Sequence, residues 1–375
     1  MDRVPQGTRG VADRLQSSVV VGGSYGRLFC AWGAAPYLGR SEAPAWKCET
    51  TRRVTPRRSS RAKEILTACK DGTGFASRRV LVTGGAGFIG SHLVDRLIEH
   101  GADVVVIDDL STSDGSNLSP KARFLKRNLA ATNLEDVVAD VQYVFHVGAV
   151  PRTQYCVENP IECHVVNALG TLRLLDACRQ YAKSLKRFVY SSSCAVYGHQ
   201  VAMPIKEDVR RNHGTPYALQ KLIGEQYVCM YATLYGVPGI SLIYSNVFGT
   251  RRQTEKGAYP NVLAAFSKQK KELGRLLITG DGEQTRDFIH VYDVVDANLK
   301  AALSDVGDGS VLNISSGRQT SINAIAGFFD CPVDYIEPRP GEARHLVLDP
   351  TKARDILGWS CKISLEEGIK LYFSS

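Results

Sequence analysis

The residues best placed to do chemistry in this sequence are a tyrosine and a lysine four positions apart. Tyr217 and Lys221 open a stretch of helical periodicity directly after Thr215 and Pro216. Residues four apart on a helix share one face, with their Cβ atoms about 5–6 Å apart. Alone, this spacing is typical of an amphipathic surface pair. Here three serines, 191–193, end the preceding predicted strand, and a hydroxyl, a phenol and an ammonium together can move a proton to or from a substrate hydroxyl.

A second chemical signal is a glycine-rich turn between a predicted strand and a predicted helix. Val80 to Thr83 form a β-prone run, Gly84, Gly87 and Gly90 follow at spacings of three, and residues 91–100 show apolar positions at helical spacing. Such glycines permit a tight turn, let the backbone approach a pyrophosphate and bring the helix close to the strand. The helix start offers unpaired N–H groups to phosphates. Three glycines can also serve structure alone, so the turn needs a second observation.

Asp108 supplies that observation. A second β-prone run, 103–107, ends at this carboxylate, 18 residues after Gly90. A carboxylate at this point can accept both ribose hydroxyls of a dinucleotide and repels a 2′-phosphate. The next residues are Asp109, Leu110 and Ser111, with no arginine directly following. The sequence therefore favours NAD over NADP.

Alternating strands and helices must position these groups. Further strands are predicted at 123–129, 141–149 and 187–190, with long helices near 160–181 and 217–235. This alternation predicts an α/β fold, a Rossmann-type doubly wound parallel sheet whose ligands bind at the carboxyl ends of the strands. A smaller C-terminal α/β domain is expected to bind the substrate. We predict an NAD-binding domain over 77–250, to which residues 288–315 return, and a substrate domain mainly over 251–375.

Composition excludes several classes of protein. The 375 residues contain no apolar run of the roughly 18 needed to span a bilayer, so no membrane partner is expected. The net charge of +8 is concentrated in residues 1–79, which hold 15 basic and 6 acidic residues. The other 296 residues hold 31 basic and 32 acidic ones. A nucleic-acid-binding face is therefore not indicated in the body of the chain. The ten cysteines include no C-x-x-C pair and no zinc-like spacing with histidine, so free thiols and no metal are predicted.

The N-terminal region differs from the rest of the chain. Residues 1–76 lack sustained periodicity and are rich in Arg, Ser, Gly and Pro, which predicts a disordered or transit-like basic extension. An artefact of upstream translation or of the gene model explains this composition equally well. We therefore expect a cytoplasmic protein, or an organellar one if residues 1–75 are a transit peptide.

Taken together, these residues resemble the extended short-chain dehydrogenase/reductases, in particular the nucleotide-sugar 4-epimerases. The resemblance rests on 83–90, Asp108, Ser193, Tyr217 and Lys221, and on the later segments 244–249, 257–259, 279–288, 339–342 and 357–359. It runs from about Arg79 to the C-terminus. It implies a Rossmann fold, tightly held NAD, a UDP-sugar substrate and a homodimer formed through the two long helices.

The resemblance also implies roles for individual residues. Tyr217 would be the base that takes the proton of the sugar hydroxyl, and Ser193 would bind the same oxygen. Lys221 and the positively charged nicotinamide together would lower the pKa of Tyr217 from its ordinary value near ~10, and Lys221 would also hold the nicotinamide ribose. Further implied NAD-binding residues are Gly84, Gly87, Phe88, Ile89, Gly90, Asp108, Asn128, Leu129, Ala149, Asn167 and Tyr244. The implied substrate-binding residues, besides Ser193, are Asn246, Ala258, Val262, Arg286 and Arg339. Three of the implied residues carry alternatives: Asn167 could order the loop after the fourth strand, and Arg286 and Arg339 could each form a surface ion pair.

Three other functions remain as alternatives. A nucleotide-sugar dehydratase of this fold uses an Asp-Glu pair after the active-site hydroxyl, where this chain has Cys194 and Ala195. A UDP-hexuronate decarboxylase is disfavoured because the usual Glu, and the Arg within the Tyr–Lys motif, are absent. A catalytically silent NAD-binding regulatory protein would not need Ser193, Tyr217 and Lys221 together. Transient oxidation at C4 with return of the hydride is therefore the predicted reaction.

Overall fold

The computed structural model describes residues 73–249, 261–338 and 343–374, which all belong to one compact unit spanning 58–375. The predicted N-terminal extension lies outside the described residues, apart from its last few. No helix within the described ranges is long and apolar enough to cross a membrane.

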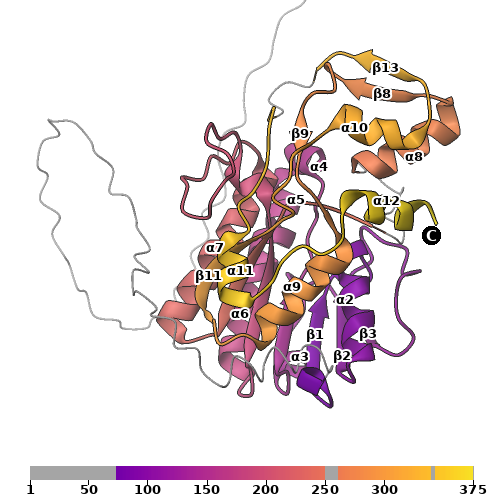
Figure 1. Cartoon of the computed structure of the whole chain (residues 1–375). Coiled ribbons are helices and arrows are strands. Elements are labelled where there is room, and N and C mark those ends of the chain that lie inside the picture. Colours follow the sequence, from indigo (N-terminus) through magenta and orange to yellow (C-terminus); the bar gives the residue numbers. More distant parts are fainter. Residues whose placement is uncertain (1–72, 250–260, 339–342, 375) are drawn as a thin grey trace, which may run out of the picture. The chain divides into compact units, whose positions relative to one another are not determined.

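A seven-stranded parallel sheet forms the centre of this unit (Figure 1). The strand order is β11-β6-β5-β4-β1-β2-β3. Because β1 lies between β4 and β2, the chain winds outward in both directions, which confirms the predicted doubly wound fold. In sequence order the strands are β1 (Arg79–Thr83), β2 (Asp103–Asp108), β3 (Arg123–Lys126), β4 (Tyr143–His146), β5 (Arg187–Ser193), β6 (Gly239–Tyr244) and β11 (Asp308–Ile314).

Helices cover both faces because successive side chains of each strand point to opposite faces and both sets are apolar. Val80 and Val82 belong to the core on one face, which also contains apolar residues of α2 (Phe88–Glu99), α9 (Val291–Leu303) and α11 (Thr351–Leu357). Leu81 packs on the other face, with α3 (Glu135–Val138), α6 (Gly170–Tyr181) and α7 (Pro216–Tyr235). Each fully buried aliphatic side chain contributes roughly 1.5–3 kcal/mol. These two apolar cores fix the sheet, and thereby the edge where its strands end.

Strand lengths differ from the predicted ones at three places. β3 ends at Lys126 and β4 at His146. The loops that follow the carboxyl ends of these two strands therefore include residues 127–129 and 147–149, which were predicted to be strand. β5 is longer than predicted, because β6 continues to Tyr244 and offers ladder partners to all three serines, with Ser193 opposite Tyr244. Ser191, Ser192 and Ser193 are therefore held in a strand and not in a loop.

The helix before β5 is also interrupted. The predicted 160–181 helix consists of α5 (Pro160–His164), a π-helical turn η2 (Val165–Leu169) and α6, after a short α4 (Thr153–Glu158). By contrast, α7 matches its prediction. Thr215 Oγ1 accepts the Ala218 N–H at 3.2 Å, Pro216 occupies the first turn, and Gly236 ends the helix at φ +70°.

A smaller lobe with its own core lies above the sheet in Figure 1. Its core joins residues such as Phe266, Ile278 and Phe329. Three two-stranded sheets, β7/β10, β9/β12 and β8/β13, accompany the lobe. The elements involved are β7 (Asn246–Phe248), α8 (Val262–Leu273), β8 (Leu276–Thr279), β9 (Thr285–Arg286), β10 (Phe288–His290), β12 (Thr320–Ser321), α10 (Ile322–Ala326), β13 (Val333–Ile336) and α12 (Leu365–Phe373).

The approach of α7 to β5 yields a testable prediction. A Cβ on Gly224 would lie 2.1 Å from Tyr190 Oη, so Gly224→Ala forces the helix and strand apart. We expect the free energy of unfolding to fall by about 1–3 kcal/mol, measured by urea denaturation. Gly327→Ala is the matched control, because its added Cβ meets nothing within 4 Å. Equal unfolding midpoints for the two variants would contradict the prediction.

Candidate active site

A cavity of about 440 Å³ opens at the carboxyl edge of the sheet. This is where an open parallel sheet binds ligands, because the crossing connections leave a crevice there. Fourteen predicted site residues line the cavity: Gly84, Gly87, Phe88, Ile89, Gly90, Asp108, Asn128, Leu129, Ala149, Ser193, Tyr217, Lys221, Tyr244 and Asn246. The fold thus brings the glycine turn and the Ser-Tyr-Lys group to one site.

The glycine turn has the form of a phosphate cradle. A Cβ on Gly90 would lie 2.1 Å from Gly84 O, and one on Gly84, at φ +69°, would lie 2.6 Å from Gly148 Cα. Gly87 differs, since a Cβ there would meet only Gly84 O at 3.3 Å. Gly87 is the N-cap of α2, with no side-chain cap and no acid in the first turn. The first residues of α2 line the cavity with no acidic side chain among them, which fits the diphosphate of a dinucleotide.

Asp108 ties the second strand to this turn. Its Oδ2 accepts the Ala86 N–H at 3.1 Å, and its Oδ1 accepts the Leu110 N–H at 2.9 Å. Burial raises the pKa of the carboxyl, and the two backbone hydrogen bonds oppose this. A carboxylate fixed in this way at the cavity wall can still accept ribose hydroxyls with its other lone pairs. The residues present therefore fit NAD.

Ser193, Tyr217 and Lys221, the Ser-Tyr-Lys group, line a different part of the cavity from the glycine turn. Both Ser193 and Tyr217 line the cavity, and the Ser193 hydroxyl is close enough to the phenol to oppose the rise in its pKa that burial causes. Lys221 Nζ donates to Ser191 O at 2.8 Å and lies 5.0 Å from the centre of the Tyr190 ring. Tyr217 is 8% exposed and Lys221 4%. Such a group can hold a hydroxyl oxygen at Ser193 and exchange its proton with Tyr217.

The expected lowering of the pKa of Tyr217 is not found in the protein alone. Burial raises this pKa above its ordinary value, and the hydrogen bond from Ser193 lowers it only in part. The physical reason is desolvation of the phenolate, which outweighs the stabilisation that the Ser193 hydroxyl gives it. Lys221 is itself affected, because burial lowers its pKa to about 8. Ionisation of Tyr217 therefore needs more positive charge than the protein itself supplies.

Asn167 is not among the described residues that line the cavity. Its Oδ1 accepts the Val150 N–H at 2.7 Å, and its Nδ2 donates to Val150 O and to Gln220 Oε1. Gln220 Nε2 donates in turn to Pro160 O at 3.2 Å. The amide of Asn167 is thus used to hold the loop after β4 against α7, the alternative that the sequence left open.

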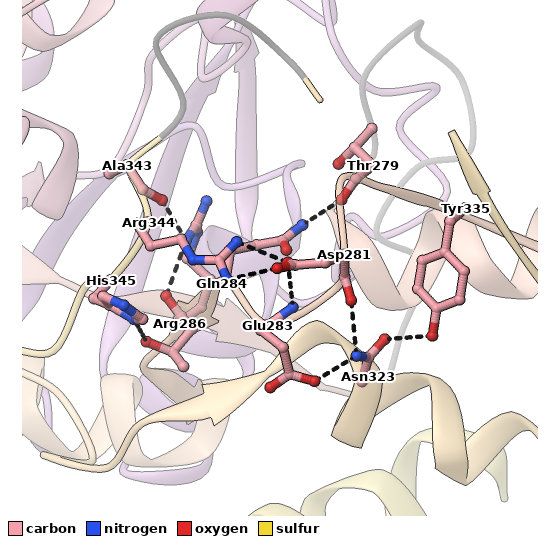
Figure 2. Close-up of polar contacts among 11 residues, drawn as sticks. Thr279, Asp281, Glu283, Gln284, Arg286, Asn323, Tyr335, Ala343, Arg344 and His345 are labelled. Atoms are coloured by element: carbon pink, nitrogen blue, oxygen red, sulfur yellow. Dashed lines mark hydrogen bonds and ion pairs between the residues drawn. The ribbon is translucent and has the colours of Figure 1, made fainter. Parts of the chain in front are cut away.

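Two predicted substrate residues occupy the smaller lobe. Arg286 Nη1 donates to Ala343 O, as Figure 2 shows, and also to Thr285 O. Burial raises the pKa of Cys194, the neighbour of Ser193, and the charge of Arg286 opposes this in part, so the guanidinium lies within electrostatic range of the catalytic end. Val262 packs into the lobe core instead of lining the cavity, whereas the adjacent Asn261 lines it.

Two further predicted residues, Ala258 and Arg339, lie outside the described residues, as do the motifs 257–259 and 339–342. The chain flanking one of these motifs is held in place. Arg344 forms a bidentate ion pair with Asp281, with both N–O distances at 2.7 Å (Figure 2). This pair joins the loop after β8 to 343–345, beside the backbone that Arg286 contacts.

Sequence reasoning missed several residues of the site. Ser113, Arg127, Gly148 and Cys194 line the cavity. The first three come from loops and Cys194 from the 3-10 turn Cys194–Tyr197 after β5, and only the fold decides where these segments run. The missed residue Glu225 had a signal, since it continues the Tyr217–Lys221 spacing by four more residues. No group of three or more His, Cys, Asp or Glu side chains in the described ranges is arranged to hold a metal.

A parallel sheet with a three-glycine turn and a Ser-Tyr-Lys group at one cavity defines a Rossmann-type dinucleotide-binding protein with a proton-transfer site. The chain belongs to the NAD dependent epimerase/dehydratase family, whose model matches residues 80–315. This confirms the family suggested by the sequence motifs.

Similar proteins support the same assignment. The putative UDP-glucose 4-epimerase of Methanocaldococcus jannaschii is 39% identical over 300 residues, covering 78% of this chain and 96% of that protein. A crystal structure of Thermotoga maritima UDP-glucose 4-epimerase with UDP-glucose has a TM-score of 0.74 at 37% identity, covering 79% and 97%. The UDP-N-acetylglucosamine 4-epimerase of Methanobrevibacter ruminantium, in complex with UDP-N-acetylmuramic acid, has a TM-score of 0.75 at 34% identity, covering 80% and 99%.

The position of Asp108 generates a prediction about the cofactor. Asp108→Asn removes the charge and leaves a single acceptor oxygen. We therefore expect NAD affinity to fall at least about tenfold and the ratio of NAD affinity to NADP affinity to decrease. Calorimetric titration with both dinucleotides measures this. Asp103→Asn, at the exposed start of the same strand, is the control and should leave both affinities unchanged. An unaltered NAD/NADP ratio in Asp108→Asn would contradict the assignment.

Proposed function

We propose that this protein is an NAD-dependent UDP-sugar 4-epimerase. The observation that carries the proposal is the single cavity that joins the glycine turn and Asp108 to Ser193, Tyr217 and Lys221. A cofactor held at the first group places its reactive end near the second. The names of the similar proteins cover epimerases of UDP-glucose, UDP-N-acetylglucosamine and UDP-glucuronic acid, which supports a UDP-sugar as substrate.

The mechanism follows from the side chains of the chain itself. Ser193 hydrogen-bonds the C4 hydroxyl oxygen of the sugar, and Tyr217 takes its proton and later gives it back. Lys221, while protonated, stabilises the Tyr217 phenolate. NAD, held at the glycine turn and Asp108, would supply a reversible acceptor for the C4 hydride, so the reaction would have no net oxidation. Asn246 lines the cavity, and Arg286 lies near its catalytic end, where each can bind the substrate diphosphate.

Elimination of water is less well supported by the geometry. A dehydratase needs an acid and a base beside the active-site hydroxyl. The residue after Ser193 is Cys194, and burial raises the pKa of its thiol to about 12, so it stays neutral at physiological pH. Ala195, the next residue, has no titratable group. Return of the hydride to C4 is therefore the reaction that this site favours.

Turnover of defined substrates tests the proposal. Purified protein is incubated separately with UDP-glucose, UDP-N-acetylglucosamine and UDP-glucuronate, and the C4 epimers are resolved by chromatography. We expect conversion of at least one, and a fall in kcat of about 10²–10⁴-fold in Tyr217→Phe with NAD still bound. Tyr227→Phe removes a hydroxyl from the same helix on the side of the apolar core and should retain activity. No conversion of any of the three substrates would refute the proposal.

We also propose that the protein forms a homodimer through α5, η2, α6 and α7. Large apolar side chains gather on these elements and are exposed in the single chain, which is typical of an interface. Ile161 is 80% exposed and Leu234 65%, and both recur at helical spacing with others: Val165, Leu169, Leu219 and Met230. Two such helices from each subunit would bury this surface as a four-helix contact.

Light scattering tests the dimer. Leu234→Asp places a charge within the proposed contact, so the mass should change from dimer to monomer at micromolar concentration. Leu371→Asp, on the exposed side of α12, is the control and should leave the mass at that of a dimer. A monomeric unsubstituted protein would exclude this assembly.

A further inference from the structure

Helix α7 carries a third polar residue on the face that bears Tyr217 and Lys221. Glu225 lies four residues beyond Lys221, so the three side chains share one side of the helix. Glu225 is 1% exposed and is not among the described residues that line the cavity. A buried carboxylate is costly unless it is paired, and contact with the substrate does not account for this one.

The partners of Glu225 are at the end of β5. Its Oε1 accepts a hydrogen bond from the Ser192 hydroxyl, and its Oε2 forms an ion pair with Arg211 Nη2 at 3.3 Å. One turn earlier, Lys221 Nζ donates to Ser191 O. Two successive residues of the strand are thus bound to two successive turns of the helix. The next residue of the strand is Ser193, so these bonds set the position of its hydroxyl relative to Tyr217.

Glu225 also acts on Lys221 through its charge. The groups that face Lys221 are Glu225 on α7, the Cys156 thiol on α4, the His146 imidazole on β4 and the Tyr190 ring on β5. Burial raises the pKa of Cys156 to about 12 and lowers that of His146 to about 3, and it raises the pKa of Tyr190 as well. All three are therefore neutral near pH 7. Burial raises the pKa of Glu225, whereas Arg211, Ser192 and Lys221 oppose this rise by favouring its ionised form. The ionised carboxylate is the negative partner of Lys221 in this set.

We propose that Glu225 is a positioning residue for epimerisation: it binds Ser192 so that Ser193 faces Tyr217, and it holds Lys221 in its protonated form. This inference rests on the proposed function. Lys221 keeps its proton below its pKa and loses it as the pH rises through that value. Removing the charge of Glu225 lowers the pKa of Lys221, so activity that needs the ammonium is lost at a lower pH.

The first test is the pH profile of the holoenzyme. In Glu225→Gln we expect the alkaline limb of kcat to move down by about one pH unit, with the KM for the UDP-sugar nearly unchanged because the side chain lies outside the cavity. Asp293→Asn is the control. Asp293 is an equally buried carboxylate, but it accepts the backbone N–H groups of Lys362 and Ile363. Asp293→Asn should lower the free energy of unfolding and leave the alkaline limb of kcat at the same pH.

A second variant gives the opposite sign and does not depend on the folding of the first. Arg211→Gln removes the cation that competes for Glu225, so the alkaline limb should move up. An unmoved limb in a folded Glu225→Gln, or in Arg211→Gln, or an equal shift in Asp293→Asn, would overturn the inference.

A third measurement separates this inference from the proposed function. The Lys221 side chain can be titrated by NMR in ¹³C-lysine-labelled protein, with its signal assigned by its loss in Lys221→Arg. Its pKa should fall in Glu225→Gln whether or not any UDP-sugar is turned over. An unchanged Lys221 titration would show that the two residues are not coupled, whereas absent turnover with a shifted titration would refute only the epimerase assignment.

Discussion

The site depends on the close docking of α7 against β5. Gly224 lets the helix backbone approach Tyr190, whose hydroxyl donates to Lys221 O at 3.3 Å. The ammonium of the same lysine reaches Ser191 O across the gap. Because the helix and the strand end are fixed to each other, the side chains that each projects into the cavity keep a constant spacing. Rigid elements hold reacting groups more closely than loops do.

A chain of buried hydrogen bonds links this docking to the cofactor end of the cavity. Gly148 N donates to Thr83 Oγ1, and the Thr83 hydroxyl lies 2.7 Å from His146 Nδ1. On the other side of the ring, Nε2 lies 2.8 Å from Thr171 Oγ1, which donates to Asn167 O. Because the Thr171 hydroxyl donates to Asn167 O, it accepts from Nε2–H. Burial lowers the pKa of His146 to about 3, so the imidazole is neutral and its Nδ1 accepts from the Thr83 hydroxyl. The floor of the cavity is thus connected to η2, whose Asn167 holds the residue before Lys221.

Burial and charge act in opposite directions on the reactive groups. Desolvation raises the pKa of Tyr217 and lowers that of Lys221, so each change favours the neutral form. The ionised set of Lys221, Arg211 and Glu225 has a net charge of +1, which a phenolate at Tyr217 would neutralise. A positively charged nicotinamide bound nearby would add to this effect. The protein by itself therefore keeps the base inactive, which is consistent with a reaction that begins only on the loaded enzyme.

The sequence alone determined the strand–turn–helix around Gly84, Gly87 and Gly90, the acid at Asp108, the helical pair Tyr217 and Lys221, and the parallel sheet that brings them together. Local periodicity and glycine spacing encode such features within a few turns of chain. Only the tertiary structure decided that β5 continues through Ser193, because a ladder needs the length of β6, and that Asn167 supports a loop. The tertiary structure also set the direction of the pKa change at Tyr217, since desolvation depends on everything packed around the phenol. It also paired Glu225 with Ser192 and Arg211, which lie far apart along the chain.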